Sequence, residues 1–133
     1  MYLVACGVLL AAGLALNLRD WRGLTLTALV GVNVFAPMPM SSAEAFYSGC
    51  ILAESIVFVS AVCLVCKASE PVAYASVALV ISHFMGYSLD AGSNPLSQYR
   101  GIVKILEVLQ LLSCVAFSPA LADILRNRDA KTT

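Results

Sequence analysis

Apolar residues occur along this chain in five long segments that are separated by short polar connections. The segments span residues 2–18, 24–40, 46–66, 72–89 and 102–125. Their lengths, 17 to 24 residues, bracket the roughly 20 residues that an α-helix needs to cross the hydrocarbon core of a bilayer. The pattern therefore predicts an all-α fold, a polytopic transmembrane helical bundle, built as a single integral membrane domain over residues 1–133.

The second segment allows two interpretations. Pro37 and Pro39 lie near its end, and proline lacks the backbone N–H that a continuing helix needs. The segment is therefore either a full span or a short, partly re-entrant helix. The sequence accordingly predicts four or five spanning helices.

The composition argues against a water-soluble domain. Hydrophobic residues make up 60% of the chain and charged residues 12%, whereas globular domains carry about 25% charged residues. A soluble domain of this size leaves a large share of its surface in water, so it cannot bury so many apolar side chains. The lipid bilayer is the predicted partner. A formal net charge of zero gives no electrostatic basis for binding nucleic acid.

Lysine and arginine are distributed unequally over the two sides of the predicted bundle. One side carries Arg19, Arg22, Lys67, Arg126, Arg128 and Lys131. The other side carries only Arg100 and Lys104. Because cytoplasmic loops hold the excess of these bases, we expect a multi-pass protein of the cell inner (cytoplasmic) membrane, with its N-terminus outside and its C-terminus cytoplasmic. The first bases follow the first apolar segment, which favours a spanning helix over a cleaved signal peptide.

Four of the predicted helices each carry a strongly polar residue at a similar depth. These residues are Asn33, Glu54, His83 and Glu107. The helical rise places the two glutamates ~8–9 Å, and the histidine ~10 Å, from the outer ends of their helices. An ionised side chain at a helix centre costs ~2.5–3.5 kcal/mol in lipid, so we expect these groups to face the bundle interior, near one another.

This intramembrane polar layer has two interpretations. It is either a pathway for a proton, a cation or a small solute, or a set of interhelical hydrogen bonds that contribute ~0.6 kcal/mol each on average. Two further polar residues share the last segment with Glu107. Lys104 is predicted to extend to the outer interface or to pair with Glu107, and Gln110 to bond to Glu107 or to a neighbouring helix.

Small residues recur at four-residue spacing in the fourth segment, at Ala78, Ser82 and Gly86. Such a stripe lets two helix backbones approach closely. We therefore expect a helix-packing role for these three residues. The contact is either within the subunit or with another chain, in a homo-oligomer or in a complex with a membrane protein partner.

No cofactor, metal site or catalytic residue is predicted. The five cysteines are scattered through apolar segments, and their odd number is not typical of a disulfide framework. Cys63 and Cys66 have C-x-x-C spacing, but no second pair or nearby histidine accompanies them. The sequence contains no phosphate-binding loop and no hydrolase motif. Enzyme activity is left open, with nothing in its favour.

The stretch SEPVAYASVALVISHFMGYSLD, residues 69–90, begins with an acidic and aromatic helix start and has a Ser-His pair near its far end. The pattern is carried by Glu70, Ala73, Tyr74, Ser82, His83 and Gly86. In these features about a third of the chain resembles the DoxX-like family of small four-helix membrane proteins. The resemblance implies a quinone-coupled redox association, known for some members, and a site role for His83 only. The chain departs from the family in having Pro71–Val72 where a tryptophan is expected, and in its additional first helix.

Three classes of function follow. The first is an ion, proton or small-solute transporter or channel-like bundle that uses the polar layer. The second is a phage holin-like permeabiliser, suggested by small size, several spans and a short charged tail. The third is a non-catalytic membrane subunit or a DoxX-like redox-associated protein.

Overall fold

The computed structural model describes residues 1–36, 42–89 and 96–132. In these ranges the chain forms six α-helices and no strand. The helices are α1 (Tyr2–Leu16), α2 (Trp21–Phe35), α3 (Ala43–Leu64), α4 (Ser69–Leu89), α5 (Leu96–Ala116) and α6 (Pro119–Thr132). The predicted all-α class is therefore confirmed.

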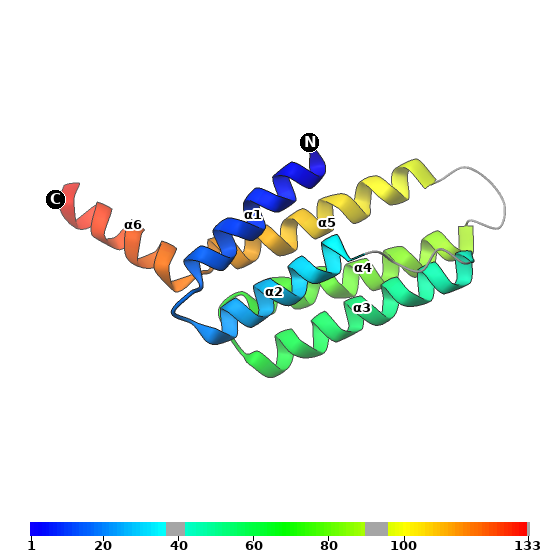
Figure 1. Ribbon diagram of the computed structural model, residues 1–133, viewed down its shortest axis with the longest axis horizontal. Helices are drawn as coiled ribbons and strands as arrows, with labels where there is room; N and C mark the ends of the chain where they lie inside the picture. The colour runs from blue at the N-terminus through cyan, green and yellow to red at the C-terminus, as the bar shows by residue number, and fades with distance from the viewer. Residues whose placement is uncertain (37–41, 90–95, 133) are drawn as a thin grey trace.

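Helices α1 to α5 lie side by side and alternate in direction, whereas α6 extends away from them (Figure 1). The most extensive contact is between α3 and α4, followed by α4 with α5 and α1 with α5. Helix α2 packs against α1, α3 and α5. The α1–α2 turn, the α3–α4 turn and the α5–α6 break all lie at the same end of the bundle (Figure 1), which we call the turn end.

Two side chains define the turn between α1 and α2. Asn17 is buried, and its Nδ2 donates to the carbonyl oxygens of Gly13, at 2.7 Å, and of Cys114 in α5, at 3.1 Å. Asp20 is the N-cap of α2, where its side chain accepts a hydrogen bond from the backbone N–H of Arg22 at 3.3 Å. Gly23 is needed here, because a Cβ would lie 2.2 Å from Oδ1 of Asn17.

The turn between α3 and α4 depends on one left-handed residue and one hydroxyl. Val65 ends α3 with φ of 48°, a conformation that β-branched residues rarely adopt. The Oγ of Ser69 then accepts a hydrogen bond from the backbone N–H of Cys66 at 2.8 Å. The chain reverses within four residues, so α4 packs back along α3.

Helix bounds differ from the predicted segments mainly near the C-terminus. The sequence predicts one helix over residues 102–125. The structure instead has two helices, α5 and α6, with a bend of 57° between them. Pro119 explains the break, because it has no N–H to donate to the preceding turn and suits the first position of a new helix. The α2 helix begins at Trp21 and ends at Phe35. Pro37, Pro39 and the predicted end of the second segment at residue 40 lie outside the described residues.

Among the described residues, one helix is both long enough and apolar enough to cross a membrane, Glu44–Leu64 within α3. A second is added if Arg100–Ala116 and Pro119–Lys131 are counted as one bent span. The α1 helix is apolar but shorter. The four or five crossings expected from the sequence thus stay a prediction.

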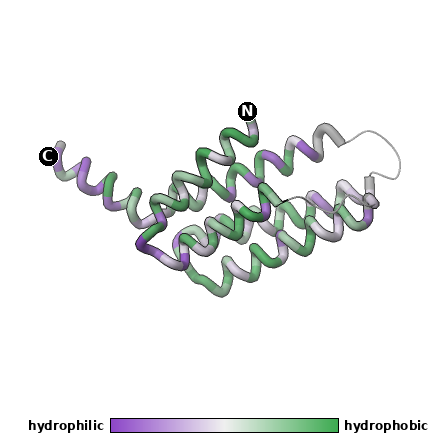
Figure 2. Tube along the Cα trace, in the orientation of Figure 1, coloured by the Kyte–Doolittle hydropathy of each residue, from purple (hydrophilic) through white to green (hydrophobic). Residues whose placement is uncertain are grey.

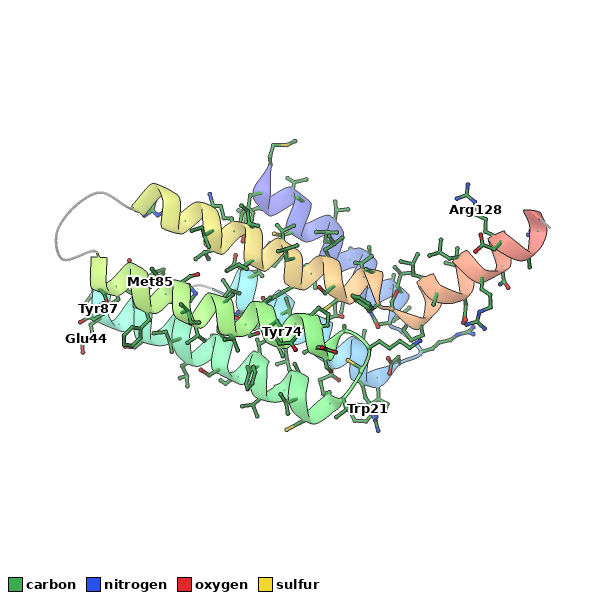
Figure 3. All side chains as sticks on the ribbon, turned by 180° about the vertical axis from the view of Figure 1, so that it is seen from behind. Trp21, Glu44, Tyr74, Met85, Tyr87 and Arg128 are labelled. Atoms are coloured by element: carbon green, nitrogen blue, oxygen red, sulfur yellow. The ribbon has the colours of Figure 1, made fainter. Side chains whose placement is uncertain are left out.

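Large apolar side chains lie on the outside of the bundle as well as in its core. Figure 2 shows mainly hydrophobic residues along α1 to α4, both kinds along α5, and hydrophilic ones concentrated in α6. Val4, Leu52, Ile81, Phe84 and Ile105 are each more than half exposed, as are Trp21 and Tyr74, which are labelled in Figure 3. The buried polar residues are Asn17, Thr27, Glu54, Ser69, Ser76, His83, Gln110 and Ser118. The core therefore combines apolar packing with a set of internal polar groups.

Candidate polar site in the bundle interior

Glu54 occupies a core position of α3. The buried residues of this helix recur every three or four positions, at Tyr47, Cys50, Glu54, Val57 and Ala61. This spacing defines the single helix face that packs inward. Glu54 lies in the middle of that face and is only 1% exposed. Its carboxyl group is therefore surrounded by protein.

Side chains from three other helices surround this carboxyl group. Nδ2 of Asn33 in α2 donates to Oε1 of Glu54, and Nε2 of Gln110 in α5 donates to Oε2 at 3.2 Å. The same Nε2 also donates to Oγ of Ser76 in α4 at 2.9 Å. These four residues form a polar junction that links α2, α3, α4 and α5. We call it the Glu54 junction.

The junction contains one polar atom without a partner. Gln110 is fully buried, and its Oε1 has no hydrogen-bond partner among the described residues. Nearly all buried polar atoms in proteins are hydrogen-bonded, and a bound water often serves where no protein group is available. The junction is therefore able to accept one more donor at Gln110, from a water molecule or a ligand.

Glu107 lies near the junction but has different partners. Its Oε2 accepts a hydrogen bond from the phenol of Tyr2 in α1. Lys104, one turn earlier in α5, places its Nζ 5.4 Å from the centroid of the Tyr2 ring. Glu107 also interacts electrostatically with Glu54, and both act on the buried thiol of Cys50. The two carboxyl groups are neighbours without sharing a hydrogen-bonding partner.

His83 is also buried, on the same face of α4 as Ser76. It follows Ser76 by seven residues, so the two side chains are ~10 Å apart along the helix axis. Tyr87 lies one turn further on, and its ring packs edge-on against Tyr47 of α3, with the ring centroids 5.6 Å apart. His83 therefore lies along α4 between Ser76 and this aromatic contact.

The four residues of the predicted polar layer are thus placed differently. Asn33 and Glu54 are in direct contact, Glu107 is their neighbour, and His83 is buried two helical turns from Ser76. Sequence reasoning missed Ser76 and Tyr2 as partners of the glutamates. Ser76 is signalled by its spacing from the other buried residues of α4, Val72, Leu79 and His83.

The remaining candidate residues have simpler surroundings. Gly86 is buried, while Ala78 and Ser82 are half-buried and joined by a hydrogen bond from Oγ of Ser82 to the carbonyl oxygen of Ala78, at 2.7 Å. All five cysteines, each in the described part, are free thiols. No group of three or more His, Cys, Asp or Glu side chains that could hold a metal ion occurs within residues 1–36, 42–89 and 96–132.

Comparisons of the chain with protein-family models, curated proteins and solved structures return no match. The resemblance to the DoxX-like family accordingly stays a prediction. What the Glu54 junction does is therefore argued from its own chemistry.

Proposed function

We propose that the chain is a multi-pass protein of the cell inner membrane, with its N-terminus outside and its C-terminus cytoplasmic. The observation that supports this is the apolar exterior of α1 to α5 around a polar junction. Contiguous apolar surface of this extent is rare on soluble monomers and fits contact with lipid. Charge adds support, because Arg19, Arg22 and Lys67 lie at the turn end, the side expected to face the cytoplasm.

The modest hydropathy of α4 and α5 is compatible with this proposal. Mean hydropathy counts every residue of a helix, including those that do not face lipid. In α4 the polar residues Ser76 and His83 are buried, and in α5 the same is true of Gln110. Both helices have 21 residues, which at 1.5 Å per residue gives roughly 30 Å, enough for the hydrocarbon core.

We further propose that the protein conducts protons or a small cation, with Glu54 as the group that binds and releases the ion. A carboxyl group deep in a membrane bundle is costly, and such residues commonly mark ion pathways. The donors from Asn33 and Gln110 stabilise its charged form, while the unpaired Oε1 of Gln110 offers a place for a water or a hydrated ion. Glu107 supplies a second carboxyl group close by.

A second candidate function is structural. The Glu54 junction links four helices, and hydrogen bonds of this kind hold membrane helices together without transporting anything. In that case the protein is a non-catalytic membrane subunit, and the junction fixes the shape that its partner binds.

One experiment on the whole chain separates these proposals. The protein is reconstituted in liposomes that contain a pH-sensitive dye, and proton flux is driven by a potassium diffusion potential. Glu54→Gln keeps the size of the side chain and one acceptor oxygen but removes its charge, so we expect the flux to fall to the level of empty liposomes. Glu44→Gln is the matched control, because Glu44 is an exposed residue in the first turn of the same helix.

The outcomes are distinct. Loss of flux in the Glu54 variant alone supports ion conduction. Wild-type flux equal to that of empty liposomes contradicts it and favours the structural candidate. Membrane insertion is tested separately by extracting membranes of expressing cells at alkaline pH, where an integral protein stays in the pellet and release into the supernatant contradicts the proposal.

A further inference from the structure

A small hollow lies at the turn end, where three connections of the chain meet. Its volume is about 280 Å³. Each connection contributes to its wall: the α1–α2 turn with the start of α2, the α3–α4 turn, and the α5–α6 break. The residues that matter for its chemistry are Asp20, Arg22, Val65, Lys67 and Phe117. The hollow is separate from the Glu54 junction, whose residues do not line it.

Two cationic side chains line this hollow from opposite connections. Arg22 comes from the first turn of α2 and Lys67 from the α3–α4 turn. Neither forms an ion pair with another described residue. The guanidinium carbon of Arg22 lies 5.5 Å from the centroid of the Trp21 ring, a contact that leaves its N–H groups available for an anion.

One carboxylate also lines the hollow, and it already has a role. Oδ1 of Asp20 accepts the backbone N–H of Arg22 and caps α2. Counting Arg22, Lys67 and Asp20 together, the charged lining still has one net positive charge. Helices α2, α4 and α6 all begin beside the hollow, at Trp21, Ser69 and Pro119, and helix N-termini add partial positive charge. The local field therefore favours an anion.

The hollow also has an apolar wall. Val65 is 70% exposed and Phe117 is 48% exposed, and both line the hollow beside the two cations. An inorganic anion makes no use of such a wall. A phospholipid does, because its phosphate is attached to a glycerol whose other carbons carry the acyl chains. Basic pockets on the cytoplasmic side of membrane bundles are typical sites for anionic headgroups.

We propose that this hollow binds the phosphate of an anionic phospholipid. Arg22 and Lys67 contact the phosphate oxygens, and Val65 and Phe117 contact the glycerol and the first acyl carbons. Arg22 is suited to this role because its planar guanidinium donates two parallel hydrogen bonds to phosphate. The inference rests on the membrane location proposed above but not on ion conduction, so a protein without any proton flux would leave it intact.

The test measures lipid retained by the purified full-length protein. Delipidated protein in mild detergent is titrated with phosphatidylglycerol or with phosphatidylcholine, and the bound lipid is counted by native mass spectrometry. We expect tighter binding of phosphatidylglycerol. The double variant Arg22→Gln/Lys67→Gln should weaken that binding by roughly 30-fold, since each base near an anionic headgroup contributes about fivefold.

A matched variant controls for general charge. Arg126→Gln/Lys131→Gln removes the same charge from exposed positions of α6 that do not line the hollow, so it should bind phosphatidylglycerol as the wild type does. Equal losses in both double variants would overturn the proposal, as would unchanged binding in the Arg22/Lys67 variant. A third arm adds inorganic phosphate at millimolar concentration. Displacement of the lipid by phosphate would assign the hollow to a soluble phosphate and overturn the lipid assignment.

Discussion

Glu54 and Glu107 are two glutamates of neighbouring helices that the bundle treats differently. Glu54 is almost completely buried and receives hydrogen bonds from two amides, which come from α2 and α5. Glu107 is half-buried and accepts one hydrogen bond, from the phenol of Tyr2 in α1. The comparison shows that two residues of the same type at similar depth differ in burial and in the number of helices that they join.

The strongest test of this comparison is to remove each carboxyl group in turn. Glu54→Leu leaves the amides of half-buried Asn33 and buried Gln110 without their acceptor, so we expect the free energy of unfolding to fall by about 2–3 kcal/mol. Glu107→Leu should reduce it by less than about 1 kcal/mol, since only one hydrogen bond is lost at a half-buried site. Unfolding in mixed micelles at increasing SDS fraction measures both values. Equal losses would show that the two sites are energetically alike.

A weaker effect is expected from replacing a residue next to each glutamate. Gln110→Leu removes the bonds to Glu54 and Ser76 but also removes the unpaired Oε1, so we expect a loss of about 1–2 kcal/mol. Lys104→Leu should change stability less, because Lys104 is exposed and its interactions with the Tyr2 ring and with Glu107 lie near solvent. The same unfolding assay applies. A larger loss from Lys104→Leu than from Gln110→Leu would reverse the comparison.

The smallest expected effect is the coupling within each hydrogen-bonded pair. A double-mutant cycle between Asn33→Leu and Glu54→Leu should give a coupling energy of about 1 kcal/mol. The corresponding cycle between Tyr2→Phe and Glu107→Leu should give about 0.6 kcal/mol, the average for hydrogen bonds between membrane helices. Zero coupling for the Asn33–Glu54 pair would mean that the amide does not hold the carboxyl group.

Much of the helical architecture could be predicted from the sequence. Helices α1, α3 and α4 fall within a few residues of the predicted segments, because long apolar runs between polar turn residues specify helices strongly. The α5–α6 break was not predicted, although its cause, Pro119, is visible in the sequence. An apolar segment of 24 residues predicts one continuous helix, but a proline within it interrupts the helical hydrogen bonds and begins a new helix.

The candidate site could be predicted only in part. Depth along a helix indicates which polar residues share a level, and it placed Asn33 beside Glu54. It does not determine the direction in which a side chain points around the helix. That direction is the reason why Gln110, one turn from Glu107, bonds to Glu54. Rotation about the helix axis depends on packing against other helices, which periodicity in a uniformly apolar helix does not reveal.

The sequence separation within the Glu54 junction determines an order of assembly. Asn33 and Glu54 are 21 residues apart on adjacent helices, so they are synthesised together and can pair early. Gln110 follows Glu54 by 56 residues, and Cys114, which binds Asn17, follows that residue by 97. When only α1 to α4 have left the ribosome, the carboxyl group of Glu54 still lacks its hydrogen bond from Gln110. Asn17 likewise lacks its bond to the carbonyl oxygen of Cys114. The bundle becomes complete only when α5 has been synthesised and packs against the other helices, so the completion of the fold depends on this last long helix.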